Sequence, residues 1–198
     1  MAEPVPGLVP GTRRPAAGAA LGKTLLLDRD GVVNVDHGYV HTPAQTHWVP
    51  GIFALCEAAQ AAGHGLLVVT NQAGIARGHY DEAQFAAYTE WLHAQFAQRG
   101  LQIAATYYCP HHPLAGQGRY RLACACRKPG PGMLLAAARD YGVDLAASTL
   151  IGDKATDMLA GQAAGVGRLL LVGDDIGAAV PSSAHQPVAD LQAALRLF

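Results

Sequence analysis

The sequence predicts an α/β fold, a Rossmann-like three-layer sandwich with a mostly parallel central sheet. Two observations lead to this fold class. Short, continuous apolar runs bounded by turn residues have the length and composition of buried strands. These runs alternate along the chain with longer segments whose apolar residues recur at helical spacing. Such alternation implies crossover connections and a sheet covered by helices on both faces.

Five strands and five helices are expected. The strands are the apolar runs at residues 24–27, 66–70, 103–108, 148–151 and 168–172. The helices, whose apolar faces repeat every three to four residues, lie near residues 50–63, 81–100, 134–141, 158–165 and 191–197. Pro50 and Gly51 mark the start of the first helix, and Asp81 with Gln84 has the pattern of a capping box at the second. Cys56 is interpreted as a small core residue.

Composition limits the class of protein. Of 198 residues, 51% are hydrophobic and 15% are charged, which suffices for one substantial core. The net charge of −1 argues against a protein that binds nucleic acid through its charge. No apolar run approaches the roughly 18 residues that span a bilayer. We therefore expect neither nucleic acid nor a membrane as partner.

A single domain is expected over residues 23–198, with no insertion large enough to form a cap domain over the site. Residues 1–22, rich in Pro, Ala and Gly, are predicted to be a flexible tail. They lack the basic start and apolar centre of a signal peptide, so we expect a cytoplasmic location. No helix shows an apolar face that requires a partner, and we expect a monomer.

Polar residues follow four of the predicted strands where each strand ends. They are Asp28 with Asp30, Thr70, Cys109 and Asp153. Because the carboxyl ends of parallel strands share one edge of a sheet, these residues are expected to converge. Crowded carboxylates repel one another, and a hard cation such as Mg²⁺ relieves that repulsion. The alternative for the first pair is a solvated Asp-Arg-Asp turn.

Two lysines, Lys128 and Lys154, bring positive charge to the same edge. Carboxylates, Mg²⁺ and lysines together are what phosphoryl transfer requires, since they neutralise the phosphoryl oxygens and align the attack. The pattern therefore favours a small phosphorylated molecule as substrate.

In this order and spacing, the motifs resemble the four signature motifs of the haloacid dehalogenase (HAD) superfamily of phosphatases. The resemblance implies that Asp28 is the nucleophile and that Asp30 protonates the leaving alcohol and then activates water. It implies that Thr70 and Lys128 stabilise the transferring phosphoryl group. It also implies Mg²⁺ on Asp28, on Asp153 and on the backbone carbonyl of Asp30.

Asp157, one helical turn after Asp153, is interpreted as a capping residue or a support for the metal ligands rather than a ligand itself.

A second group of residues has the composition of a structural zinc site. Cys109, His111, Cys124 and Cys126 offer three thiolates and one imidazole, a complete tetrahedral set. They lie in a stretch of about twenty residues without periodicity, which needs another source of order. His112 competes with His111 as the ligand, and reduced, unligated cysteines are the alternative to zinc.

This cysteine loop resembles the zinc loop of the D-glycero-D-manno-heptose-1,7-bisphosphate 7-phosphatases, and the histidinol-phosphate phosphatases share much of the pattern. Asp36-His-Gly-Tyr39 and Asn71-Gln-Ala73 strengthen the resemblance to the heptose enzymes. Arg127 could instead be a solvated neighbour of the zinc site. By resemblance, the substrate is contacted by Arg29, Asp36, His37, Gly38, Tyr39, Asn71, Gln72, Ala73, Arg127 and Lys154.

Three functions remain in competition. The first is Mg²⁺-dependent hydrolysis of the 7-phosphate of D-glycero-D-manno-heptose 1,7-bisphosphate through an aspartyl-phosphate, on the way to ADP- or GDP-heptose for surface glycans. The second is a histidinol-phosphate phosphatase of histidine biosynthesis. The third is a non-catalytic binding module built on the zinc loop.

Overall fold

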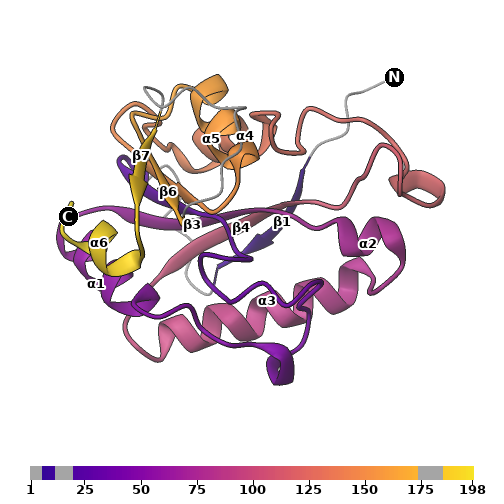
Figure 1. The fold of residues 1–198 in the computed structure, drawn as a ribbon, viewed down its shortest axis with the longest axis horizontal. Coiled ribbons are helices and arrows are strands. Elements are labelled where there is room, and N and C mark those ends of the chain that lie inside the picture. The colour runs from indigo at the N-terminus through magenta and orange to yellow at the C-terminus, as the bar shows by residue number, and fades with distance from the viewer. Residues whose placement is uncertain (1–5, 12–19, 174–184) are drawn as a thin grey trace.

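The computed structural model describes residues 6–11, 20–173 and 185–198 (Figure 1). In these residues a seven-stranded sheet has the order β1-β4-β3-β2-β5-β6-β7, and all neighbouring strands are parallel except β1 and β4. The strands are β1 (Gly7–Pro10), β2 (Thr24–Leu27), β3 (Gly65–Asn71), β4 (Ile103–Cys109), β5 (Thr149–Gly152), β6 (Arg168–Val172) and β7 (Gln186–Val188).

Helices cover both faces of the sheet. The helices are α1 (Ile52–Ala61), α2 (Ala73–Arg77), α3 (Glu82–Ala97), α4 (Gly132–Tyr141), α5 (Ala155–Ala164) and α6 (Leu191–Leu195). In Figure 1, α4 and α5 lie on one side of the sheet, while α1, α3 and α6 lie on the other. The predicted three-layer α/β fold with a mostly parallel sheet is confirmed. None of the helices in the described ranges is long and apolar enough to span a membrane.

Strand β2 lies at the centre of this arrangement. Its side chains are fully buried and alternate between the layers: Leu25 and Leu27 pack with α1 and α3, and Leu26 packs with α4 and α5. The chain proceeds from β2 to β3 on one side and later from β5 to β6 on the other. In open α/β sheets such a reversal of strand order leaves a crevice at the carboxyl ends of the strands.

The five predicted strands and five predicted helices are all present, with ends that differ by a few residues. The capping box is confirmed, since the Asp81 carboxylate accepts from Gln84 N and the Gln84 side chain accepts from Asp81 N. The prediction omitted the short elements α2 and β7. Cys56 is a buried core residue on α1, as expected.

The prediction of a flexible tail over residues 1–22 is wrong for Gly7–Pro10. This segment forms β1, which pairs antiparallel with the fully buried strand β4. The short run Gly-Leu-Val-Pro can lie there because Gly7 leaves room for the ring of Tyr108, which a Cβ atom would meet at 2.2 Å. Residues 1–5 and 12–19 of the predicted tail lie outside the described residues.

Candidate active site

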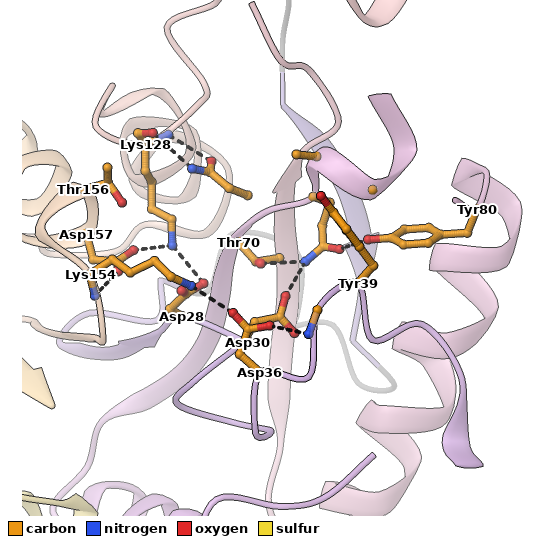
Figure 2. Close-up of a pocket in the computed structure, with 15 residues that line it drawn as sticks. Asp28, Asp30, Asp36, Tyr39, Thr70, Tyr80, Lys128, Lys154, Thr156 and Asp157 are labelled. Atoms are coloured by element: carbon orange, nitrogen blue, oxygen red, sulfur yellow. Dashed lines mark hydrogen bonds and ion pairs between the residues drawn. The ribbon is translucent and has the colours of Figure 1, made fainter. Parts of the chain in front are cut away.

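A cavity of about 340 Å³ opens at the carboxyl ends of the central strands (Figure 2). Both acids of the first motif, Asp28 and Asp30, line it together with Thr70 and Lys128. These residues follow or end β2 and β3, or belong to the loop before α4. The structure therefore brings together residues that are up to a hundred positions apart in the sequence, at the sheet edge that was predicted.

A buried ion-pair cluster lies on one side of the cavity. The ammonium of Lys128 lies 2.9 Å from Asp28 Oδ1 and also pairs with Asp157 Oδ1, as Figure 2 shows. It donates a further hydrogen bond to the carbonyl of Val69 at 3.0 Å. Although burial acts to lower the pKa of Lys128, the carboxylates of Asp157 and Asp28 outweigh it and raise that pKa. Lys128 is thus held as a cation beside Asp28.

Asp157 lies close to the acids but is already engaged. Its second oxygen, Oδ2, accepts a hydrogen bond from Lys154 N at 3.1 Å at the start of α5, so it caps that helix. The structure supports the interpretation of Asp157 as a capping residue, and its pairing with Lys128 adds a contact that the sequence did not reveal.

The carboxylates of Asp28 and Asp153 fit a divalent cation, and that of Asp157 lies beside them. One oxygen from each lies within 4.8 Å of the others. The Oδ1 atom of Asp153 is buried and has no hydrogen-bond partner among the described residues. Burial, with repulsion from Asp28 added, raises the pKa of Asp153 to about 7. A bound cation would remove this cost, and an oxygen-only donor set suits Mg²⁺.

The loop after β2 can approach Asp153 only because residue 31 is glycine. Gly31 has a positive φ of 94°, and a Cβ atom there would lie 2.1 Å from Asp153 Oδ2. Any larger residue would push the two acidic motifs apart. The glycine of the Asp-Arg-Asp-Gly motif therefore brings the two carboxylate-bearing loops together.

The carboxylate of Asp30 is held by donors from three residues. Arg29 makes a bidentate contact with it, Nη2 lying 2.8 Å from each oxygen. Asn34 Nδ2 donates to Oδ1 at 3.0 Å, and Gln72 Nε2 donates to Oδ2 at 3.1 Å. With this many donors, Asp30 has a fixed orientation at the edge of the cavity.

The side chains of Arg29 and Asn71 make contacts within the protein. Arg29 is 1% exposed, donates to the carbonyl of Val40 and lies over the rings of Phe85 and Tyr88. It does not line the cavity, which corrects the prediction that Arg29 contacts the substrate. Asn71 lines the cavity, but both ends of its amide hold the backbone of Lys128, at 3.0 Å each.

The remaining predicted substrate contacts divide into two groups. Neither His37 nor Arg127 lines the cavity: His37 contacts His47 at 3.0 Å, and Arg127 donates to the carbonyl of His111 at 3.2 Å. The latter contact agrees with the alternative reading of Arg127 as a neighbour of the cysteine cluster. The residues that do line the cavity are Asp36, Gly38, Tyr39, Gln72, Ala73 and Lys154.

Lys154 connects one of these loops to the acids. Its ammonium lies 3.2 Å from Asp36 Oδ2 and 3.4 Å from Asp153 Oδ2. Figure 2 shows the Lys154 side chain extending across the cavity toward Asp36. Burial alone would lower the pKa of Lys154, but the acids around it raise that pKa, so Lys154 remains a cation.

The predicted zinc ligands are brought together as well. The sulfur atoms of Cys109, Cys124 and Cys126 lie 3.0–3.5 Å apart, and His111 Nδ1 lies 3.7 Å from two of them. Tetrahedral ligands with Zn–S bonds of about 2.3 Å would be about 3.8 Å apart, so the cluster fits zinc after small adjustments. His112 lies outside it and accepts from the backbone of the loop, which favours His111 as the fourth ligand.

Several functional contacts were not predicted from the sequence. Glu82 accepts from Tyr108, Tyr120 and Arg119 and so fastens the cysteine loop to α3 and β4. Tyr80 contacts Gln72 beside the cavity. Neither residue belongs to a motif, and an isolated tyrosine or glutamate in a helical region gives no signal of such a contact.

Several known proteins have sequences similar to that of this chain. The HAD-hydrolase-like family model matches residues 125–190. The D-glycero-beta-D-manno-heptose-1,7-bisphosphate 7-phosphatase of Vibrio cholerae is 49% identical over 148 residues, which are 75% of this chain and 80% of that protein. The corresponding alpha-heptose enzyme of Burkholderia mallei is 48% identical over 84% of this chain and 88% of its own.

Solved structures give the same result. The D,D-heptose 1,7-bisphosphate phosphatase of B. bronchiseptica, crystallised with magnesium and phosphate, is 35% identical with a TM-score of 0.75, covering 88% of this chain and 97% of its own. A HAD-like phosphatase from Mesorhizobium loti superimposes with a TM-score of 0.82 at 34% identity, over 99% and 94% of the two chains. The chain therefore belongs to the HAD superfamily of phosphoric monoester hydrolases, and within it to the family of the D-glycero-D-manno-heptose-1,7-bisphosphate 7-phosphatases.

Proposed function

We propose that this chain hydrolyses the 7-phosphate of D-glycero-D-manno-heptose 1,7-bisphosphate through an aspartyl-phosphate intermediate. The observation that carries the proposal is the pairing of Asp28 with Lys128 beside Asp153, with Asp30 facing the same cavity. Relatives at 48–49% identity carry the name of this activity. The product would enter the synthesis of ADP- or GDP-heptose for surface glycans.

In the proposed mechanism, a carboxylate oxygen of Asp28 attacks phosphorus, and the bond from phosphorus to the departing sugar oxygen breaks. Asp30 gives its proton to that oxygen, then takes one from the water that hydrolyses the acyl phosphate. Lys128 and the hydroxyl of Thr70 stabilise the charge of the transferring group. Asp28, Asp153 and the backbone carbonyl of Asp30 would hold Mg²⁺, which supplies further charge neutralisation when bound.

The other residues of the proposal support the site. Cys109, His111, Cys124 and Cys126 would bind structural zinc, which orders the loop that carries Lys128. Thiolate ligands require a reducing compartment, which supports a cytoplasmic location. Asp36, Gly38, Tyr39 and Lys154 would contact the sugar, because they line the same cavity as Asp28 and Lys128.

The test is phosphate release in the presence of Mg²⁺, measured as kcat/KM for both anomers of heptose 1,7-bisphosphate and for histidinol phosphate. We expect a preference for the heptose of at least about a hundredfold, which corresponds to about 2.7 kcal/mol in the transition state. A preference for histidinol phosphate would overturn the substrate. Both anomers are needed, since the relatives include enzymes named for each.

Asp28→Asn is the control for the mechanism. The amide has nearly the same size as the carboxylate but cannot form the acyl phosphate, so turnover should be lost while the folded structure remains. Turnover that survives this change would exclude Asp28 as the nucleophile. A wild type without turnover on any of these substrates would instead favour a non-catalytic role for the fold.

A further inference from the structure

The buried amide of Gln72 bridges Asp30 and Thr70, two residues that line the cavity. Gln72 is 1% exposed, and its Nε2 atom donates to Asp30 Oδ2 at 3.1 Å and to Thr70 Oγ1 at 2.8 Å. A fully buried side chain whose donors are already used has little left to offer a substrate. The contact of Gln72 with substrate stays a prediction, since Gln72 also lines the cavity.

The orientation of the Gln72 amide is determined by its neighbours. The carboxylate of Asp30 accepts hydrogen bonds and cannot donate when ionised, so the amide must present Nε2 to it. Its other end, Oε1, then faces Tyr80, whose hydroxyl donates to it at 2.5 Å. Burial raises the pKa of Tyr80 to about 12, so the phenol keeps the proton that it donates. A flipped amide would place Oε1 against the carboxylate of Asp30 and lose that hydrogen bond.

Tyr80 is itself fixed in place. It is 4% exposed, and its ring stacks on His41 with a centroid distance of 4.6 Å. Gly74 makes room for it, because a Cβ atom at that position would lie 2.4 Å from the ring. The contact between Tyr80 and Gln72 is therefore built into the packing of α2 against the segment before α3 (Figure 2).

We propose that Gln72, with its amide locked by Tyr80, is the positioning residue that aims the carboxyl group of Asp30 at the leaving oxygen. Arg29 and Asn34 hold Asp30 from the side of its own loop, and Gln72 holds it from the β3 side. Because Thr70 Oγ1 accepts from Gln72, the hydroxyl proton of Thr70 is free to point into the cavity. One amide thus orients both groups.

This inference rests on the proposed function, since it assumes that Asp30 protonates the leaving alcohol. The test compares two substrates with kcat/KM, which includes the step in which the leaving group departs. The sugar bisphosphate has a poor leaving group that needs the proton from Asp30. 4-Nitrophenyl phosphate has a good leaving group that does not. Variants that misplace Asp30 should therefore harm the first substrate more than the second.

Gln72→Glu replaces the donor with a carboxylate of nearly equal size, which repels Asp30. We expect kcat/KM to fall about a hundredfold for the sugar bisphosphate, mostly through kcat, and less than about tenfold for 4-nitrophenyl phosphate. Tyr80→Phe removes only the hydroxyl and should show the same selectivity with a loss of about five- to tenfold. Gln162→Glu, the same change on the exposed face of α5, is the matched control.

The outcomes separate the possible roles. A raised KM with unchanged kcat would make Gln72 a substrate contact and overturn the proposal. Equal losses of kcat/KM on both substrates, or no loss on either, would overturn it as well. If thermal melting shows that Gln72→Glu is not folded, Tyr80→Phe provides the test. Failure of the wild type to hydrolyse the sugar bisphosphate, with selective losses retained on another alkyl phosphate, would overturn the proposed substrate and leave this inference intact.

Discussion

Asp28 and Lys128 form one ion pair, but the backbones that carry them are held by different means. Asp28 follows β2, which has parallel partners on both sides, and Asp28 N itself donates to the carbonyl of Ile151 at 2.9 Å. Lys128 lies between β4 and α4, where the chain forms only a short 3-10 helix (Gly118–Tyr120). Besides a few backbone hydrogen bonds, such as that from Gly130 N to the carbonyl of Arg127, side chains hold that loop: the cysteine cluster, Glu82 and Asn71.

The difference indicates where this catalytic site is vulnerable. Backbone hydrogen bonds of a sheet are shared over many residues, so the loss of one side chain leaves the position of Asp28 nearly unchanged. The position of Lys128 depends on a few side-chain contacts, each of which can be removed by one substitution. We expect mutations in the loop to lower activity with little change in the fold.

The largest effect is expected from the cysteine cluster. Cys126 lies two residues before Lys128 and is buried against the sheet. Cys126→Ser should lower the zinc content from about one ion per chain, since a serine hydroxyl is a poor zinc ligand, and should lower kcat at least about tenfold in saturating Mg²⁺. Metal analysis and kinetics on the same preparation measure both quantities.

Two controls accompany this variant. Cys56→Ala removes a cysteine that packs on α1 away from the cluster and should leave the zinc content unchanged. Circular dichroism should show the helices and strands retained in Cys126→Ser. Wild-type protein that contains no zinc after mild purification would refute the zinc site, and a collapse of the sheet in Cys126→Ser would refute the distinction between the two regions.

A smaller effect is expected from Asn71. Its amide makes two hydrogen bonds with the backbone of Lys128, and each such bond contributes about 0.5–1.5 kcal/mol. Asn71→Ala should lower the free energy of unfolding by about 1–3 kcal/mol and kcat by about tenfold, because Lys128 is then less well placed. Urea unfolding and kinetics test this. A rise of KM alone would instead restore Asn71 as a substrate contact.

The same contrast explains how much the sequence could predict. The convergence of residues at the ends of strands, such as Asp28, Thr70 and Asp153, was predicted because the topology of a parallel sheet brings strand ends together. The clustering of Cys109, Cys124 and Cys126 was predicted because the chemistry of cysteine groups is recognisable without a fold. In both cases the residue type or its place in a regular element carried the information.

The rest depended on contacts that no local pattern specifies. Arg29 stands between Asp28 and Asp30 in the sequence, but its side chain turns inward to Asp30 and two aromatic rings. Strand β1 is four residues long, and only its pairing with β4 makes it a strand. Tyr80 and Glu82 act through partners more than five residues away. Such contacts follow from tertiary packing, which a single sequence does not display.

The last effect concerns the part of the fold held by the sheet, where a buried histidine contacts β4. His93 on α3 is 2% exposed and lies 2.8 Å from Thr106 Oγ1 on β4. Burial lowers the pKa of His93 to about 4, from an ordinary value of 6.5. Between these values the unfolded chain binds a proton that the folded chain does not, so stability is complete above pH 6.5 and declines as the pH falls toward 4.

His93→Gln tests this contribution, because glutamine can also reach Thr106 but does not titrate. Between pH 7 and pH 5, the wild type should lose about 2 kcal/mol of unfolding free energy more than the variant, as the slope approaches about 1.4 kcal/mol per pH unit. Urea unfolding of both proteins at several pH values measures the difference, and other titrating groups, including Asp153, cancel in it. If the unfolding free energies of the two proteins change with pH in parallel, His93 is not the source of the acid sensitivity. The contact of His93 with β4 would then be as insensitive to acid as the backbone hydrogen bonds of the sheet.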